Sequence, residues 1–304
     1  MRKFSQILLL LWGLLFLDGC VIVEEPLDYR HGISDYEAKR IVRKVFLSQH
    51  SLADASLLTS VSVGSLLDDY AQIHYDPYAN RYGCDDRGYF RLQLGSDGLQ
   101  LTIDSGDLLE IKYQTCQTEL YSGFAPQLNG PVAITYHQNR LDRYSRMLDF
   151  TVTYHDALLT TLFGAYYLEG SIGVHYDEDM QRGMLALVLS SNRFQLYGDR
   201  YTQRDRFDNV VLDFTMDTIS QRYRYNYSGT LYNSYLGRLT FSTFLPLEGI
   251  GDQNPAMGEL KIGNAQMQLI VTPLDDYYVD IQLISNSDPT ENRTIHTTWL
   301  NLGL

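Results

Sequence analysis

The chain has 304 residues, and 24 lysine and arginine side chains against 37 aspartate and glutamate side chains give a formal net charge of −13. Such an acidic surface repels phosphate backbones and anionic lipid headgroups, which argues against nucleic-acid binding and against electrostatic adhesion to a membrane. The sequence also contains 24 tyrosines. Because tyrosine suits a pleated, half-buried surface with one wet end, this excess indicates a β-rich protein.

The N-terminus has the pattern of a bacterial export signal. Arg2 and Lys3 precede an apolar run over residues 7–17, which has the length of a signal-peptide core and is too short to span a bilayer. The run ends in the stretch LDGC, which resembles the lipobox of bacterial lipoproteins and would make Cys20 the lipidated residue. Asp18 departs from the small or aliphatic residue usual at its position, and ordinary signal cleavage nearby is the alternative.

Lipidation at Cys20 would determine where the protein is found. Two or more acyl chains would anchor it stably to a membrane. Val21, rather than aspartate, follows the cysteine, and by analogy with Gram-negative lipoproteins this favours the outer membrane and a periplasm-facing protein. We therefore predict a signal peptide over residues 1–19 and a lipidated tether over residues 20–33.

A helix is predicted over residues 35–49. Ser34 and Glu37 have the spacing of a capping box, and apolar side chains then recur at helical spacing. Residues 51–71 are expected to form a second, shorter helical region that breaks near Gly64 and docks on the rest of the domain. The opposite face of the first helix carries basic side chains and is expected to be exposed to solvent. These side chains are Lys39, Arg40, Arg43 and Lys44.

From about Asp76 onward the period of the apolar residues falls from 3.6 to 2, which predicts β-strands. Breaks rich in glycine, serine and aspartate at 95–98 and 104–107 separate the alternating runs, as in successive antiparallel hairpins. Similar segments begin at Leu128 (LNGPVAITYHQ) and Leu168 (LEGSIGVHYDE), with a looser copy in YSGTLYNSY. They indicate a repeated β building block.

These features predict an all-β, mainly antiparallel fold with an N-terminal helical segment. A helical lead-in over residues 34–72 would precede an antiparallel β domain over residues 73–304. The domain would be either a large curved sheet or a β-sandwich meander.

Cys84 and Cys116 are left as a pair if Cys20 carries the lipid. In an oxidising compartment such a pair is most simply a disulfide, and closing a loop of this length would stabilise the fold by about 3 to 4 kcal/mol. A metal site is the alternative, but it would need further histidine or cysteine ligands, and none lies nearby in the sequence.

The motifs together resemble a group of uncharacterised β-rich lipoproteins of Gram-negative bacteria. The shared layout is a lipobox, a helical lead-in, a cysteine pair that encloses a Gly-Asp turn, repeated Leu-Asn-Gly strands and a Thr-Thr-Trp terminus. The resemblance implies the compartment and a β-rich fold, and no activity. The corresponding pieces here are Cys84 to Cys116 around Gly106-Asp107, Leu128-Asn129-Gly130, the strand from Pro255 to Ile262, and Thr297-Thr298-Trp299 with Leu300-Asn301-Leu302.

The catalytic motifs in the sequence are incomplete. The stretch DSGD at 104–107, with Asp104, is similar to an aspartic-protease half site, but the second copy is missing, and we interpret it as a hairpin turn. His155 and His175 lie next to acidic residues, yet adjacent strand residues point to opposite faces. A Gly-x-Ser-x-Gly elbow and a free thiol are both absent. We therefore predict no catalytic residue and no cofactor.

Metal binding is weakly indicated. The acidic stretches at 177–179 and 85–86 offer oxygen atoms that calcium could use, but neither has the ligand spacing of an EF-hand loop. A His-Glu-x-x-His zinc motif is also missing. We predict no metal site.

Several tyrosines suggest a surface that stacks on the sugar rings of a glycan. The alternative, which we favour, is that Tyr223, Tyr225 and Tyr227 share one sheet face and pack against neighbouring strands. The tyrosines concerned are Tyr223, Tyr225, Tyr227, Tyr232 and Tyr235.

The predicted function is that of a lipid-anchored envelope lipoprotein with a non-enzymatic binding or scaffold role. Its partners would be the membrane, through the lipid, and an envelope protein, a glycan or a lipid ligand. The alternative is a carrier that holds lipid or another hydrophobic ligand in a cavity of the curved sheet. An envelope hydrolase that uses His155, His175 or Asp104 ranks lowest.

Overall fold

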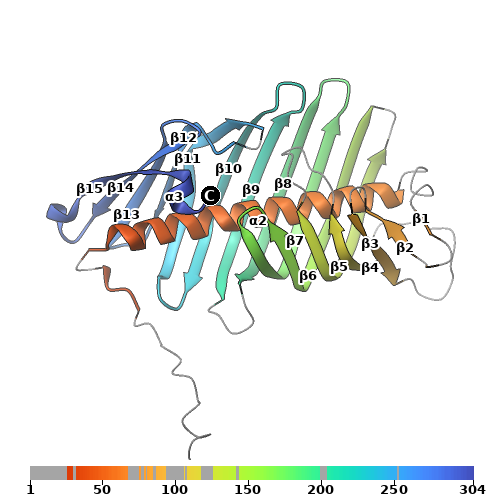
Figure 1. Cartoon of the computed structure of the whole chain (residues 1–304), viewed down its shortest axis with the longest axis horizontal. Coiled ribbons are helices and arrows are strands. Elements are labelled where there is room, and N and C mark those ends of the chain that lie inside the picture. Colours follow the sequence, from red (N-terminus) through yellow and green to blue (C-terminus); the bar gives the residue numbers. More distant parts are fainter. Residues whose placement is uncertain are drawn as a thin grey trace, which may run out of the picture.

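The structure is a computed structural model of the chain (Figure 1). The predicted signal peptide and Cys20 lie outside the residues that it describes, as do residues 95–98 and Asp104. The described residues are 26–29, 32–67, 75–76, 79, 81–84, 87–93, 106, 108–117, 126–141, 144–198, 204–251 and 253–304.

One antiparallel sheet makes up most of the described structure. Its 15 strands are ordered β1 to β15 as they follow one another in the chain, so that each pairs with its neighbours in sequence. This arrangement confirms the predicted all-β antiparallel meander, and it takes the form of a large curved sheet. The strands are β1 (Tyr75–Asp76), β2 (Arg81–Gly83), β3 (Arg87–Gln93), β4 (Leu108–Gln117), β5 (Gln127–Leu141), β6 (Ser145–Thr161), β7 (Gly164–Asp179), β8 (Met184–Tyr197), β9 (Asp205–Asp217), β10 (Arg222–Asn233), β11 (Gly237–Ile250), β12 (Met257–Gly263), β13 (Met267–Pro273), β14 (Tyr278–Ser285) and β15 (Arg293–Thr298).

A single long helix, α2 (Asp35–Leu67), crosses the strands along the concave face of this sheet (Figure 1). It begins at the predicted capping box: the Ser34 amide donates to Glu37 Oε2 at 2.7 Å, and the Glu37 amide donates to Ser34 Oγ at 3.2 Å. The prediction of a separate second helical region over residues 51–71 with a break near Gly64 was wrong, because α2 is one continuous helix from Asp35 through Gly64 to Leu67. Packing along the whole helix offsets the intrinsic cost of one glycine.

The hydrophobic core lies between α2 and the concave face, and both elements contribute to one cluster of buried side chains. Apolar residues of α2 are fully buried at helical spacing, including Ile41, Val45 and Leu52. The short helix α3 (Trp299–Leu302) inserts Trp299 against Phe46, with ring centroids 5.0 Å apart. The 3-10 helix η3 (Pro289–Glu291) connects β14 to β15.

The basic face of α2 is less solvated than the sequence predicted. Lys44 forms an ion pair with Asp205 at the start of β9, and only 21% of the Lys44 side chain is exposed. The Arg40 guanidinium lies 4.9 Å from the ring centroid of Tyr235. The sheet curves around the helix and reaches side chains that a helix on a flat surface would leave in water, which explains the error.

Bulges and glycines produce the curvature. Consecutive strand pairs shift in register at similar positions along the strands. One such shift lies between Tyr154 and Ala157 in β6. The repeated Leu-x-Gly segments belong to these bends: Gly130 and Gly170 have positive φ angles of 127° and 130°. A Cβ atom on Gly170 would lie 2.7 Å from the Arg193 carbonyl oxygen. The repeat therefore marks where strands bend and approach closely.

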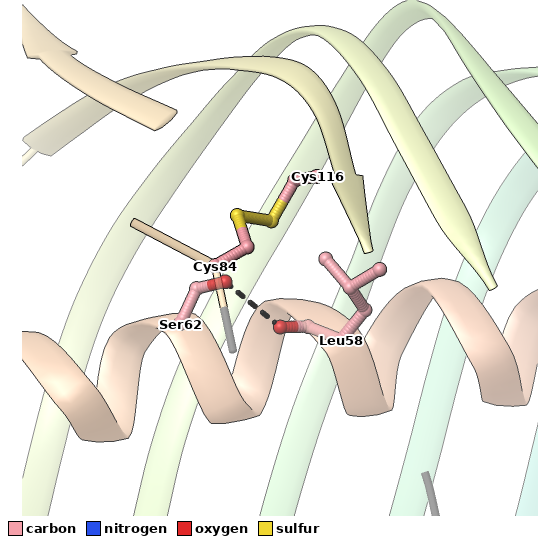
Figure 2. Close-up of a disulfide and its surroundings, with 4 residues drawn as sticks. All are labelled: Leu58, Ser62, Cys84 and Cys116. Atoms are coloured by element: carbon pink, nitrogen blue, oxygen red, sulfur yellow. Dashed lines mark hydrogen bonds between the residues drawn. A yellow bond between two sulfur atoms is a disulfide. The ribbon is translucent and has the colours of Figure 1, made fainter. Parts of the chain in front are cut away.

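The predicted disulfide joins Cys84, just after β2, to Cys116 in β4, with Cα atoms 5.6 Å apart. Figure 2 shows the bond beside the C-terminal half of α2, near Leu58 and Ser62. There the Ser62 hydroxyl donates to the Leu58 carbonyl at 3.0 Å. The disulfide links the first strands of the meander across β3, at the end of the sheet where the strands are shortest.

Candidate functional site

A polar hollow opens on the convex face of the sheet, on the side away from α2. Its volume is about 550 Å³. Strand side chains alternate between the two faces, so Ile172 and Val174 of β7 are buried toward the helix while Ser171 and Gly173 face outward. We call this cavity the convex hollow. It is lined by Thr151 of β6, by Glu169, Gly170, Ser171 and Gly173 of β7, and by Ser190, Ser191, Asn192, Arg193 and Gln195 of β8.

Small residues create the hollow. Thr151, Gly173 and Ser190 are aligned across three neighbouring strands. A Cβ atom on Gly173 would already lie 2.9 Å from Ser190 Oγ. The register then shifts between Ser171 and Gly173, and the Ser191 hydroxyl turns to donate to the Ser171 carbonyl at 2.6 Å. The bend that curves the sheet around α2 therefore also forms the depression on the convex face.

The charged side chains of the hollow have partners at its rim. Glu169 Oε2 lies 2.7 Å from the Arg204 guanidinium, which also donates to Gln195 Oε1 at 3.3 Å. The Arg193 guanidinium lies 3.2 Å from Asp208 Oδ1. One carboxylate and one guanidinium line the cavity itself, so its formal charge is balanced.

Two stacked tyrosines lie on the same two strands as the hollow. Tyr167 and Tyr197 are paired two ladder positions beyond Glu169 and Gln195, and their ring centroids are 5.4 Å apart. The Arg204 guanidinium covers the Tyr197 ring at 4.5 Å. The Tyr197 hydroxyl donates to Asp156 Oδ1. Burial, and then this hydrogen bond, raise the pKa of Tyr197 to about 12, so the phenol stays protonated as a donor.

The histidines singled out in the sequence do not assemble with their acidic neighbours. His155 and Asp156 are both exposed, and Asp156 is a bulge residue with a φ of 52° whose carboxylate accepts from Tyr197. His175 pairs across the strands with Asp149 and with an apolar residue of β8. Both histidines lie inside strands rather than at strand ends, His155 in β6 and His175 in β7.

One hydroxyl of the hollow does contact an imidazole. His137 Nε2 lies 2.9 Å from Thr151 Oγ1. The imidazole is exposed, and the described structure shows no carboxylate bonded to it that would orient it as a base. The pair therefore lacks the third group of a hydrolytic triad.

The acidic stretch at 177–179 is used within its own hairpin. The Tyr176 hydroxyl donates to Glu178 Oε2 at 3.0 Å, and Asp179 Oδ1 accepts the amides of Gln181 and Arg182, each at 3.0 Å. Across the described residues, no three histidine, cysteine, aspartate or glutamate side chains lie close enough to hold a metal ion. Residues 85–86 and Asp107 are not among the described residues.

The predicted packing of three tyrosines on one face of β10 is confirmed, and this is the concave face. Tyr223, Tyr225 and Tyr227 are 9%, 3% and 2% exposed, so they cannot stack on an external glycan. The Tyr227 hydroxyl instead lies 2.8 Å from Ser48 Oγ of α2. Tyr235, the last of the group, donates its hydroxyl to Glu37 Oε1 at 2.7 Å.

Hydroxyl groups join α2 to the concave face. In addition to the contact of Ser48 with Tyr227, Thr59 Oγ1 lies 3.0 Å from the Tyr154 hydroxyl. The Tyr225 hydroxyl is buried there without a hydrogen-bond partner in the described structure. The helix therefore occupies the surface on which a carried hydrophobic ligand was expected to lie.

Two titratable side chains of α2, one helical turn apart, were not singled out in the sequence. His50 packs its ring 4.8 Å from that of Phe163, and burial lowers its pKa to about 4. Burial raises the pKa of Asp54 to about 7. The four-residue spacing of His50 and Asp54 could have indicated that the two side chains lie on one face of the helix. The same spacing is found in ordinary ion pairs exposed to solvent, so it did not single them out.

No protein-family model, no curated protein and no solved structure matches the chain. The resemblance to envelope lipoproteins therefore stays a prediction. No helix in the described part of the chain is both long and apolar enough to cross a membrane. The fold and the site define a long antiparallel meander that curves around one helix and carries a polar hollow on its outer face.

Proposed function

We propose that this protein is a lipid-anchored envelope lipoprotein of a Gram-negative bacterium, held at the outer membrane and facing the periplasm. Support for the anchor comes from the basic start, the apolar run over residues 7–17 and the LDGC stretch that ends at Cys20. The Leu27 amide donates to the Tyr235 carbonyl at 2.8 Å, so few residues would separate a lipid on Cys20 from the folded domain. This proximity would keep the sheet close to the membrane surface.

We further propose that the protein acts by binding or as a scaffold rather than by catalysis. The observation that carries this role is the convex hollow, an open polar surface of about 550 Å³ in the middle of the sheet. Its hydroxyls lie beside paired charges, and the His137 imidazole that contacts Thr151 is exposed. Such a surface, lined mainly by polar side chains, suits recognition of a polar ligand.

Metabolic labelling with an alkyne-tagged palmitate tests the anchor. The wild-type protein should take up the label, and Cys20→Ser should lose it. Cys116→Ser is the matched control and should keep it, because that cysteine lies in β4, far along the chain from the export signal. An unlabelled wild-type protein, or a labelled Cys20→Ser variant, would overturn the proposal.

The carrier function remains the alternative, and the position of α2 defines what it requires. The helix covers the apolar concave face, with residues such as Ile41 and Leu52 fully buried, so a hydrophobic ligand could bind there only if α2 moved. Organic extraction of the purified protein followed by mass spectrometry separates the two functions. A stoichiometric lipid beyond the covalently attached chains would favour the carrier over the scaffold.

A further inference from the structure

We propose that the convex hollow is a binding site for a neutral oligosaccharide. This inference rests on the proposed binding function and goes beyond it, because it names the chemical class of the ligand. The residues concerned differ from Tyr223, Tyr225 and Tyr227, which are buried. Four observations support the inference: the balance of charge, the pattern of hydrogen-bonding groups, a stacked pair of tyrosines on the same two strands, and the central position of the strands.

Charge balance argues for an uncharged ligand. Glu169 and Arg193, the charged residues that line the hollow, already have partners of opposite charge in Arg204 and Asp208. A phosphate or carboxylate ligand would have to compete with Asp208 for the guanidinium, within a protein whose net charge is −13. A cationic ligand would have to displace Arg204. A neutral ligand can use the same groups while both ion pairs stay intact.

The hydrogen-bonding groups suit hydroxylated sugars. The remaining polar side chains of the hollow are hydroxyls and amides: Thr151, Ser171, Ser190, Ser191, Asn192 and Gln195. Hydroxyls and amides both donate and accept, as sugar hydroxyls do. They are arrayed on neighbouring strands, which lie about 4.7 to 4.9 Å apart. A sugar chain that runs across β6, β7 and β8 would therefore meet a polar group on each strand.

A stacked pair of tyrosines, Tyr167 and Tyr197, lies on the same two strands as these groups. The Tyr167 ring is half-buried beside Glu169, and stacking on Tyr197 holds it in place. The Tyr197 ring is itself fixed by Arg204 above it and by the hydroxyl bond to Asp156. An immobilised aromatic face next to polar groups suits a sugar ring, which has an apolar C–H face and hydroxyls at its edge. Little side-chain entropy would be lost on binding.

The position of the hollow argues against a peptide that binds as an added strand. β6, β7 and β8 are central strands, each paired on both sides. Their backbone groups are already used in the sheet, so strand addition, which needs a free edge, is not available there. A ligand on this face must bind through side chains. The open shape of the hollow suits an extended chain that lies on the surface.

Binding of the full-length protein to chitohexaose and maltohexaose, followed by titration calorimetry, tests the inference. Wild type should bind at least one of these neutral sugars, and its Kd should change by less than about twofold between 50 and 500 mM salt, since no charge is exchanged. Ser190→Tyr fills the hollow and should weaken binding by about tenfold or more, the equivalent of losing one or two hydrogen bonds. The control is Ser242→Tyr, an exposed serine of β11 outside the hollow, which should leave the Kd unchanged.

A second variant keeps the test decisive if Ser190→Tyr does not fold. Asn192→Ala removes an exposed amide at the hollow and should weaken sugar binding severalfold without a change in the circular dichroism spectrum. Absence of binding to either sugar, or equal loss in Ser190→Tyr and Ser242→Tyr, overturns the oligosaccharide inference.

A photo-crosslinking amino acid at position 190 in cells then separates the two proposals. A protein adduct at position 190 and none at position 242, together with no sugar binding, would leave the binding function standing with a protein as the ligand. No adduct at position 190 and no sugar binding would overturn the proposed function of the hollow as well.

Discussion

The pair of titratable residues on α2 predicts a pH dependence that cancels in the wild-type protein and appears when either residue is replaced. Burial raises the pKa of Asp54 from 3.8 to about 7 and lowers that of His50 from 6.5 to about 4. The perturbations are Asp54→Asn and His50→Gln. Each removes one titrating group and keeps a polar side chain of similar size.

The two contributions have opposite signs. Between pH 3.8 and about 7 the folded protein holds a proton on Asp54 that the unfolded chain has released, so the stability due to Asp54 is lost as the pH rises through this window. Between pH 6.5 and about 4 the unfolded chain holds a proton on His50 that the folded protein lacks, so the stability due to His50 is lost as the pH falls. Each slope is at most about 1.4 kcal/mol per pH unit.

In the wild type the two slopes oppose each other between about pH 4 and pH 6.5. The free energy of unfolding of Asp54→Asn, measured relative to wild type, should therefore rise with pH by up to about 1.4 kcal/mol per unit. That of His50→Gln should rise, relative to wild type, as the pH falls through the same range. Taking differences from wild type removes the other titrating groups, because all three proteins share them.

Urea unfolding at half-unit intervals from pH 4 to pH 7.5, followed by far-ultraviolet circular dichroism, measures these differences. An ion pair between a charged Asp54 and a charged His50 is the competing arrangement. It would lower the pKa of the carboxyl and raise that of the imidazole. The difference for Asp54→Asn would then stay nearly flat between pH 4 and pH 6.5, because the carboxyl would be charged in both states there, and this result would refute the reasoning from burial.

Three further comparisons test the packing, and each is measured by chemical unfolding. Tyr154→Phe removes a hydroxyl that is bonded to α2 and should cost about 1 kcal/mol, whereas Tyr225→Phe removes a buried, unpartnered hydroxyl and should be neutral or stabilising; equal losses would contradict this account. Gly170→Ala should destabilise the fold by about 2 kcal/mol or more, because the new Cβ meets backbone at 2.7 Å, and Gly237→Ala, with open space around it, should cost clearly less. Reducing the disulfide at Cys116 should cost about 3 to 4 kcal/mol, and an unchanged urea midpoint would show that the bond closes no entropically important loop.

The local elements were largely predictable. The Ser34 and Glu37 capping box marks the start of α2, because a cap depends on residues within one turn. Period-2 alternation identified the strands, and the antiparallel order followed from turn residues between consecutive runs. The pairing of Cys84 with Cys116 followed from setting Cys20 aside, which leaves two of the three cysteines, and from assuming an oxidising compartment.

The candidate site was not predictable in the same way. Its residues come from three strands, and it is hollow only because small side chains of β7 and β8 meet in register across a bend. In the sequence, Gly173 and Ser190 are ordinary small residues. Repeated glycines did indicate a repeated building block, but the pattern does not reveal that Gly170 lies where two strands approach closely.

By itself, the sequence determined the acidic charge, the start of the helix and the strand content, because each depends on composition or on neighbours along the chain. Only the tertiary structure decided what covers each surface. Periodicity reports which side of an element is buried and not what buries it. Ser48 and Thr59 of α2 look like solvent-facing residues, yet they are buried because Tyr227 and Tyr154 bring hydroxyl partners to them from strands that follow much later in the chain.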